Sequence, residues 1–189
     1  MTQNVWGVLA IALCLAPTAF SQRMSVDFDP AATKINWSLA GTVHTIHGTF
    51  QLKQGHVDVN AANGDVAGEL IVEADSGSSG EATRDKRMKK EVLETGRYPE
   101  IRLKVTRLEG AEPLKNESNV RVVGQFSIHG ASHEVTIPLQ IAISGTEFNG
   151  TGKFFLPFVD WGMKDPSNFL LKVNKTVEVE LVAIGHVRR

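Results

Sequence analysis

The segment from Val120 to Ile143 constrains the fold more than any other part of the chain, because its apolar side chains recur at every second position. In its first half, the apolar residues on one side of an extended strand are Val120, Val122, Phe126 and Ile128. In its second half, the corresponding residues are Val135, Ile137, Leu139, Ile141 and Ile143. This period of two predicts a β-hairpin that buries one face and exposes the other.

Gly130 lies between the two halves and suits the first central position of a two-residue type II′ turn, where the backbone φ is positive. That turn predicts that Phe126 faces Val135 and that Val122 faces Leu139. A slip of one residue would move the apolar side chains of one strand to the solvent side. The pattern therefore favours a well-defined register.

Short alternating runs of the same kind occupy most of the remaining chain, at 33–39, 44–50, 52–59, 66–74, 101–105, 146–155 and 177–181. The exception is the stretch 80–96, where good helix formers predict one α-helix. Ser78 and Glu81 resemble a capping box at its start, and Gly96 and Pro99 supply the stop. Eight strands, or up to ten short ones, in antiparallel order with a single helix predict an all-β fold, either a closed barrel or a sandwich.

The first 21 residues predict a secretory signal peptide. The apolar run Val5–Leu15 is too short to span a bilayer comfortably, and Ala19 and Ser21 provide small residues for a signal peptidase. We expect cleavage after Ser21, which leaves residues 22–189 as one periplasmic or secreted domain. The mature chain would then lack cysteine, because the single cysteine of the sequence is Cys14.

Charge and motif content argue against several classes of function. The chain has 20 Lys and Arg against 21 Asp and Glu, so no overall charge draws it to nucleic acid. No nucleophile elbow, catalytic triad pattern or carboxylate pair is present, and we expect no catalytic residues. His44 and His47 fall on opposite faces of one strand, as do His129 and His133 in the predicted register, so we expect no metal site.

Five short motifs follow one another along the chain: Gly48-Thr49-Phe50, Thr83-Arg84-Asp85, Tyr98-Pro99-Glu100-Ile101, Gly124 with His129-Gly130, and Asp160-Trp161-Gly162. From about Val26 to the C-terminus the chain thereby resembles the YceI-like family of lipid- or polyisoprenoid-binding proteins. The resemblance implies a lipocalin-like barrel that holds a long isoprenoid chain, such as a quinone or polyprenyl tail, and no other cofactor. Two family positions differ, with Ala40 in place of a histidine and Arg87-Met88 in place of His-Leu, so the headgroup stays open.

A hollow barrel would bind its ligand through inward-facing side chains. The parity of the strands places the following residues on the inner face: Trp37, Leu39, Ile46, Phe50, Leu70, Val72, Leu103, Val105, Phe126, Ile128, Ile137, Leu139, Phe148, Val179 and Leu181. His44 is the titratable group on the face of Ile46 and Phe50, either as a headgroup contact or as a hydrogen-bonded histidine at the rim. Arg84 and Arg87 would contact a phosphate-bearing headgroup or a membrane, unless they belong to an ordinary charged helix.

Three functions remain open at this point. The first is non-catalytic lipid binding, which apolar burial alone can drive, because ten buried methylenes contribute about 8 kcal/mol before ordering costs. The second is a structural or interaction barrel with a filled core, since periodicity does not separate a cavity lining from packed side chains. The third is a small hydrolase or isomerase that uses His44. Pro138 cannot donate to a ladder and predicts a bulge or an exposed edge, where a homodimer could form.

Overall fold

Nine β-strands and one short helical segment make up the part of the chain described by the computed structural model, which is residues 23–60, 65–110, 117–168 and 172–189. The strands are β1 (Arg23–Phe28), β2 (Lys34–Ala40), β3 (Thr45–Asn60), β4 (Val66–Ser78), β5 (Glu100–Glu109), β6 (Glu117–Ile128), β7 (Ala131–Ser144), β8 (Glu147–Leu156) and β9 (Val177–Arg188). The helical segment consists of α1 (Ala82–Arg87) and a π-helical turn, η1 (Met88–Val92). The predicted signal peptide lies outside the described residues.

Strands β2 to β9 form a closed ring in which every neighbouring pair is antiparallel. The predicted eight-stranded barrel is therefore confirmed. The ninth strand, β1, continues the line of β2. It pairs with the second half of β3 and the end of β9, whereas β2 pairs with the first half of β3 and the start of β9.

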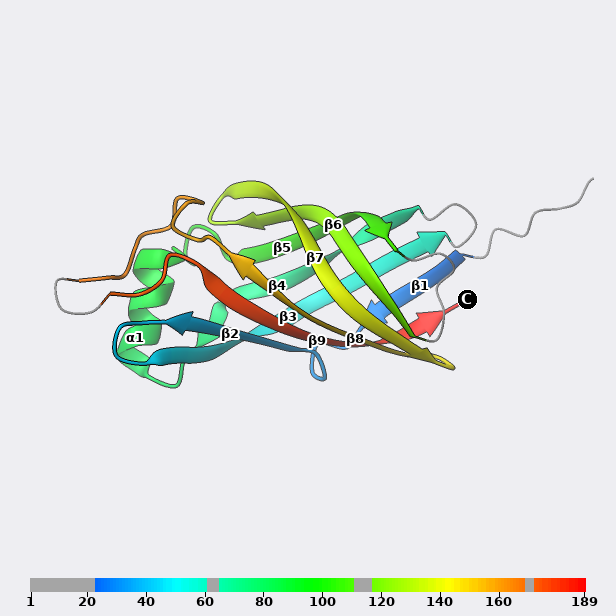
Figure 1. The fold of residues 1–189 in the computed structure, drawn as a ribbon, viewed down its shortest axis with the longest axis horizontal. Helices are drawn as coiled ribbons and strands as arrows, with labels where there is room; N and C mark the ends of the chain where they lie inside the picture. Colours follow the sequence, from blue (N-terminus) through cyan, green and yellow to red (C-terminus); the bar gives the residue numbers. More distant parts are fainter. Residues whose placement is uncertain (1–22, 61–64, 111–116, 169–171) are drawn as a thin grey trace, which may run out of the picture.

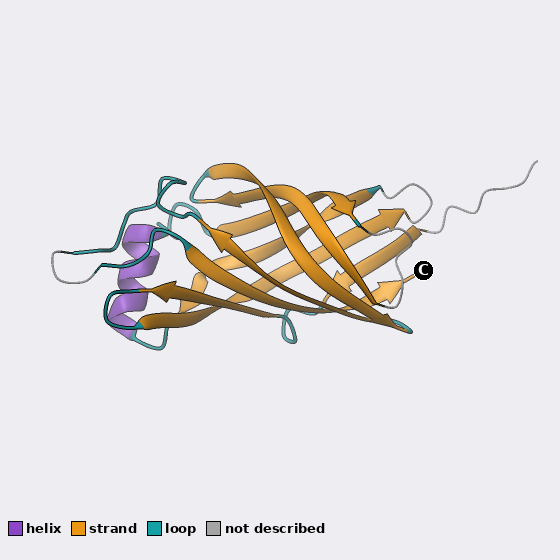
Figure 2. Ribbon diagram, in the orientation of Figure 1, coloured by secondary structure: helices purple, strands orange, loops and turns teal. Residues whose placement is uncertain are grey.

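The two ends of the barrel differ in what covers them (Figure 1). The helical segment lies across one end, and β1 and the C-terminus lie at the other. The long connection between β8 and β9 also extends to the helix end (Figure 2). Within the described ranges, no helix is both long enough and apolar enough to cross a membrane.

The hairpin of β6 and β7 forms as predicted, but its register is wrong by two residues. Phe126 lies opposite His133 and Val122 opposite Ile137, each two positions before the predicted partner. A shift of two preserves the alternation of faces, so the apolar sides of the two strands still coincide.

The cause of this shift is the turn between the strands. His129 and Gly130 both have positive φ, 51° and 77°, which is typical of a type I′ turn rather than type II′. Gly130 thus takes the second central position, and a Cβ there would come within 2.5 Å of the Tyr98 ring. The tight packing of Tyr98 on the turn explains why this position needs glycine.

The predicted helix is present but shorter than the expected 80–96, and Ser78 does not cap it. Glu81 is the N-cap, and its carboxylate accepts hydrogen bonds from the backbone N–H groups of Thr83 and Arg84 at 2.8 and 2.7 Å. Met88 and Leu93 turn their side chains toward the barrel interior and pack against its core. The helix thereby closes one end of the barrel with an apolar stripe and exposes its charged side.

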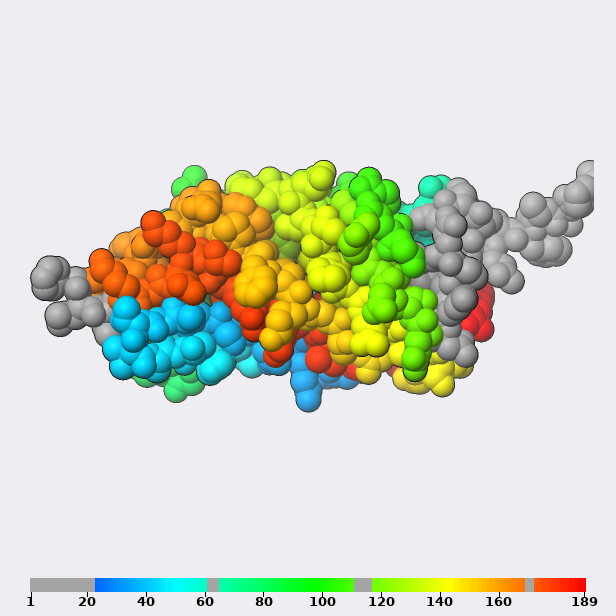
Figure 3. Space-filling view, in the orientation of Figure 1, coloured from blue at the N-terminus to red at the C-terminus, as the bar shows by residue number. Residues whose placement is uncertain are grey.

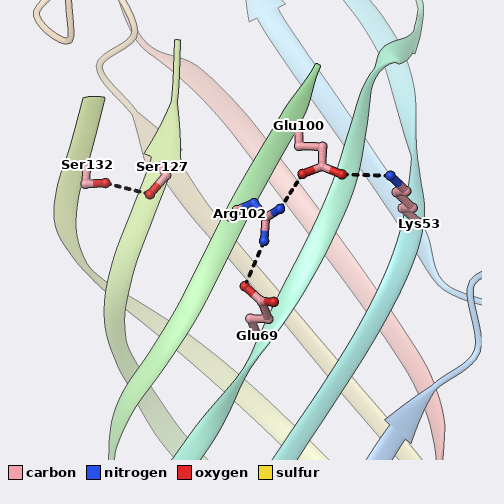
Figure 4. A network of polar contacts seen from close by, with 6 residues as sticks. All are labelled: Lys53, Glu69, Glu100, Arg102, Ser127 and Ser132. Atoms are coloured by element: carbon pink, nitrogen blue, oxygen red, sulfur yellow. Dashed lines mark hydrogen bonds and ion pairs between the residues drawn. The ribbon is translucent and has the colours of Figure 1, made fainter. Parts of the chain in front are cut away.

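The outer face of the barrel is polar where the inner face is apolar. On β3, β4 and β5, Arg102 bridges Glu100 and Glu69 at 2.5 and 3.1 Å, and Glu100 also pairs with Lys53 at 2.7 Å (Figure 4). The ammonium group of Lys53 and then the guanidinium of Arg102, both hydrogen-bonded to Glu100, hold the pKa of that carboxyl below its usual value. These exposed pairs add little stability.

The interior contains two apolar clusters, one toward each end. The cluster at the β1 end consists of buried side chains from β1 and from strands around the ring, namely Val26, Val57, Val59, Val66, Val105, Val120, Val122, Ile137, Ile141, Ile143, Phe148, Ala183 and Val187. We call this the filled half. The cluster at the helix end includes Trp37, Leu93, Ile101, Phe126, Phe158 and Met163, and it surrounds a cavity. We call this the hollow half.

Candidate ligand-binding site

A cavity of about 340 Å³ occupies the hollow half. It is lined by apolar side chains from all eight ring strands, from the helical segment and from the connection between β8 and β9, namely Ile35, Trp37, Leu39, Ile46, Phe50, Leu52, Leu70, Val72, Met88, Val92, Leu93, Ile101, Leu103, Phe126, Ile128, Ile137, Phe154, Leu156, Phe158, Met163, Pro166, Val173, Val177, Val179 and Leu181. The polar members of the lining are Arg84, Arg87 and Asn168. Such a chamber suits a hydrocarbon better than any polar solute.

The floor of the cavity is the boundary with the filled half. Ile137 lines the cavity and belongs to the filled cluster, with only 2% of its surface exposed. Leu70, Leu103, Phe154 and Leu181 also line the cavity while packing against that cluster. The cavity therefore ends within the barrel and does not pass through it.

The structure places twelve of the sixteen predicted ligand-binding residues around the cavity: Trp37, Leu39, Ile46, Phe50, Leu70, Val72, Leu103, Phe126, Ile128, Ile137, Val179 and Leu181. Arg84 and Arg87 also line it. Many of these apolar side chains, such as Leu39 and Val72, point inward yet are only half-buried. These side chains therefore lie around the cavity, and part of the inner face lacks packing partners.

Four predicted residues lie elsewhere. Val105, Leu139 and Phe148 belong to the filled half, where they pack into or against its core. The alternation along each strand predicts that these side chains point inward, but it does not predict where along the barrel axis they lie. His44 is the larger correction, because it precedes β3 in the exposed turn after Gly41 and does not share the inner face.

Sequence reasoning missed lining residues of two kinds. Ile35, Ile101 and Val177 have the inward parity and could have been included on that signal. Phe158 and Met163 come from the irregular connection between β8 and β9, where no periodicity exists to indicate burial. Their burial follows only from the tertiary structure, in which this connection folds back over the barrel.

The ring is incompletely paired in the hollow half, between β7 and β8. The two strands pair from Ser144 with Glu147 up to Leu139 with Gly152, and no further. Beyond that point β7 pairs with β6 alone and β8 pairs with β9 alone. The split begins at Pro138, which has no N–H to donate. We call residues 131–138 of β7 and 153–156 of β8, which form no ladder with each other, the seam.

The chain that follows β8 covers the seam. Trp161 stacks on His133 of β7 with ring centroids 4.1 Å apart and an angle of 2° between the planes, and it also contacts Phe126 at 5.8 Å. In the space-filling view, the orange segment after β8 lies against the yellow-green start of β7 (Figure 3). Phe158 and Met163 of this segment are buried and line the cavity. Side-chain packing thus closes a wall that hydrogen bonds leave open.

The Arg84 side chain is held in one orientation by Ser79. Its Nε donates to Ser79 Oγ at 2.7 Å and its Nη2 donates to the Ser79 carbonyl at 2.9 Å. Asp85 in turn accepts hydrogen bonds from the Ser79 backbone N–H and from the hydroxyls of Ser78 and Ser79. Burial alone would raise the pKa of Asp85, but these hydrogen bonds and the charge of Arg84 outweigh it, so the pKa lies below its ordinary value.

Trp37 carries the second notable polar group of the lining. Its side chain is 8% exposed, and its Nε1 is buried without a hydrogen-bond partner in the described part of the chain. Leaving a buried donor unpaired costs about 1–3 kcal/mol. Gly48 lies opposite Trp37, and a Cβ at that position would come within 2.3 Å of the indole, so the glycine makes room for the ring.

Among the described residues, no group of three or more His, Cys, Asp or Glu side chains is placed to hold a metal ion. The chemistry that the cavity does support is enclosure of an apolar molecule, and the lining side chains with N–H groups are Arg84, Arg87, Asn168 and Trp37.

Known proteins provide an independent comparison. A family model described as YceI-like domain matches residues 27–184. No curated protein matches the sequence. The solved structure of BcnA from Burkholderia cenocepacia is similar in fold, with a TM-score of 0.68, 18% identity, and coverage of 84% of this chain and 99% of that one.

Two further structures agree. A polyisoprenoid binding domain from Saccharophagus degradans, implicated in plant cell wall breakdown, gives a TM-score of 0.67 at 18% identity and covers 86% of this chain and 98% of its own. The YCEI protein of Campylobacter jejuni gives 0.58 at 10% identity, with both chains fully covered. The family match spans most of the sequence and the barrel topology agrees with it, so this chain belongs to the YceI-like family.

Proposed function

We propose that the hollow half of the barrel binds and sequesters the chain of a long isoprenoid-type lipid, such as a polyprenyl or quinone tail, without catalysis. The observation that carries this proposal is the apolar cavity of about 340 Å³. Ligand pockets typically measure about 300–1,000 Å³. Apolar cavities of about 150 Å³ already stay dry and accept apolar guests. A cavity this large and this apolar favours occupation by hydrocarbon over water.

The energy for binding comes from removal of the lipid chain from water. Each buried methylene contributes about 0.8 kcal/mol, so a chain that buries ten of them gains about 8 kcal/mol before the cost of ordering. Polar contacts are not needed for tight binding. Carrier, buffer and protective roles all follow from such sequestration.

The isoprenoid class is supported by one neighbour. The Saccharophagus degradans domain of the same fold is described as polyisoprenoid-binding. At 18% identity it supports a shared fold, and the ligand class is carried to this chain as part of our proposal. Arg84 and Arg87, which line the cavity from helix α1, are the charged groups available to a lipid headgroup.

The alternative functions have less support. A filled structural barrel accounts for the half around Ile141 and Phe148 but not for the cavity beyond Ile137. A hydrolase or isomerase based on His44 lacks a site, because His44 is exposed and does not line the cavity. Sequestration requires only the apolar cavity and needs no reactive group.

The proposed cellular setting is outside the cytoplasm, through cleavage of residues 1–21. We also propose transient contact with a membrane through the helix end, where Val43 is 73% exposed in the turn between β2 and β3. N-terminal sequencing of the mature protein and co-sedimentation with lipid vesicles test these two points. A homodimer through the unpaired edge of β7 is a further proposal, and light scattering of the purified protein measures it.

The decisive experiment for sequestration is mass spectrometry of an organic extract from the purified protein, followed by titration with a prenyl compound. Val72→Trp fills the cavity from β4 and should abolish uptake. Glu73→Trp adds the same side chain at the next position, which is exposed, and should bind normally. Clean protein that takes up no prenyl compound, or equal binding by both variants, would refute the proposal.

A further inference from the structure

The wall of the hollow half lacks a backbone ladder at the seam. The pairing of β7 with β8 stops at Leu139 and Gly152. Beyond that point β7 stays paired with β6 as far as Ala131, and β8 stays paired with β9 as far as Leu156. The two edges of the seam can therefore separate while both neighbouring hairpins keep their hydrogen bonds.

Residues 157–163, which we call the cover, close the seam from the β8 side (Figure 3). Backbone hydrogen bonds hold the cover in shape, as from Trp161 to Pro157 and from Met163 to Phe158, both at 3.1 Å. In the described part of the chain, no backbone hydrogen bond runs from the cover to β7. The cover thus belongs to the β8 side of the seam and contacts β7 through side chains.

The contact that closes the seam is the stack of the Trp161 ring on the His133 ring, whose centroids lie 4.1 Å apart. Nε2 of His133 is buried there, and it has no hydrogen-bond partner among the residues that the structure describes. Water can supply that partner once the seam opens. Opening therefore loses a ring stack but hydrates a buried polar atom, and the second effect offsets part of the first.

The helix end of the barrel has hydrogen-bonded ties that the contact across the seam lacks. Thr95, which follows the helix, donates to Asp75 of β4 at 3.0 Å. Lys164 donates to Glu91 of η1 at 2.6 Å. The start of α1 is also hydrogen-bonded to the residue that follows β4. Hydrogen bonds to charged groups are stronger than neutral ones, so this end is closed by more than ring packing.

Apolar side chains lead from the outer surface at the seam into the cavity. Phe155 of β8 is 62% exposed, whereas its neighbours Phe154 and Leu156 line the cavity. Phe158 and Met163 of the cover line it as well. Movement of the cover away from β7 would therefore open the cavity sideways, along a path that a hydrocarbon can follow without crossing a polar layer.

We propose that the lipid enters and leaves the cavity through the seam and that Trp161 and His133 set the rate of this exchange. The inference rests on the proposed function, because it concerns the route to that cavity. The ring stack separates, the cover moves with the β8 side, and the chain passes between β7 and β8. The strand ladders persist throughout, so exchange requires local opening and no unfolding of the barrel.

The test measures rates and affinity separately, with geranylgeraniol that carries an anthraniloyl fluorophore. Stopped-flow mixing gives the association and dissociation rates, and equilibrium titration gives the Kd. Trp161→Ala should raise both rates by about two- to tenfold, as expected for the loss of one ring stack. The Kd should stay unchanged, because Trp161 is not among the residues that line the cavity in the described ranges.

His133→Phe should act in the opposite direction. It keeps a ring for Trp161 to stack on and removes the buried nitrogen that lacks a partner. Both rates should fall by about fivefold or more, again with an unchanged Kd, because opening no longer hydrates a polar atom. This variant keeps the test decisive if Trp161→Ala does not fold.

The control variant loosens the helix end. Thr95→Val with Lys164→Gln removes the two ties to Asp75 and Glu91 and should leave both rates unchanged. Faster exchange in this control, with wild-type rates in Trp161→Ala, would assign the route to the helix end and overturn the inference. A weaker Kd through faster dissociation alone in Trp161→Ala would make Trp161 part of the binding surface and would also overturn it.

The same measurements separate this inference from the proposed function. Tight binding by the wild type with exchange rates that neither Trp161→Ala nor His133→Phe alters would refute the seam route and leave sequestration intact. Failure of the wild-type protein to bind the prenyl probe would instead refute the proposed function, and the inference with it.

Discussion

The two halves of the barrel are built from the same strands and the same alternation, yet one is packed and the other is hollow. In the filled half, side chains such as Ile141 and Phe148 are packed in one buried cluster and are 5% and 8% exposed. In the hollow half, inward side chains such as Leu39 and Val72 are only half-buried around a cavity. Alternation therefore decides which way a side chain points, and the distance across the barrel decides whether it finds a partner.

The two halves also differ in the hydrogen bonding between β7 and β8. The β7–β8 ladder runs through the filled half and stops at Leu139 and Gly152, near the floor of the cavity. A packed core and a complete ladder coincide at one end, and a cavity and a seam coincide at the other. We infer that the filled half contributes most of the folding stability and leaves the hollow half free to adapt to a ligand.

The largest expected difference between the halves concerns stability. Ile141→Ala, in the filled half, should lower the free energy of unfolding by about 2–5 kcal/mol, because it leaves a void in packed surroundings. Ile46→Ala, in the hollow half, should cost about 1 kcal/mol, because Ile46 already borders a cavity. Denaturant unfolding of both variants measures the contrast, and equal losses would contradict it.

Enlarging a side chain should give the next largest contrast. Val122→Phe overfills the packed half and should cost about 1–3 kcal/mol of unfolding free energy. Val72→Phe, the same substitution in the hollow half, should be nearly neutral, since the ring can enter the cavity. Thermal unfolding of the two variants provides the comparison. A strongly destabilised Val72→Phe would show that the cavity does not accept a larger group.

Loss of the side chain that covers the seam should increase hydrogen exchange locally in β7. Trp161→Ala removes the ring that stacks on His133 and should cost about 0.5–1.5 kcal/mol beyond its lost burial. Hydrogen exchange should speed up for the β7 amides of 131–138 and stay unchanged for those of 139–144, which remain laddered to β8. Release of a bound lipid should also be faster. Uniform acceleration along β7 would argue against a local seam.

The smallest effect is a pH dependence at the filled end. His56 of β3 contacts Asp27 of β1 at 2.7 Å, and this hydrogen bond, with help from Asp58 and against the effect of burial, raises the pKa of His56 above its ordinary value of 6.5. The stabilisation is therefore full below about pH 6.5 and is lost as the pH rises through the raised value.

Because the imidazole is 44% exposed, the contribution should not exceed about 1 kcal/mol. His56→Gln should flatten the pH profile of unfolding in this window, whereas His44→Gln, at an exposed position outside the strands, should leave it intact. A profile that keeps its shape in His56→Gln would rule out this contact as the source.

Much of the candidate site could be predicted from the sequence because the inner face repeats with a period of two. Val72 and Val179 needed only that rule to be placed inward. His44 failed because the strand starts after it, at Thr45, and the residues before a strand do not obey its alternation. Phe158 and Met163 could not be found, since an irregular connection has no period and its position depends on the whole barrel.

The sequence by itself determined most of the strands and the face that most of their side chains take, because these follow from local alternation and from turns, while the residues alone left a barrel and a sandwich open. Only the tertiary structure decided which layers of the interior are filled, where the β7–β8 ladder ends and which donors lack partners. Those properties depend on distances between strands far apart in the chain. A hairpin register shifted by two residues illustrates the division, since local parity survived the shift while every cross-strand contact changed.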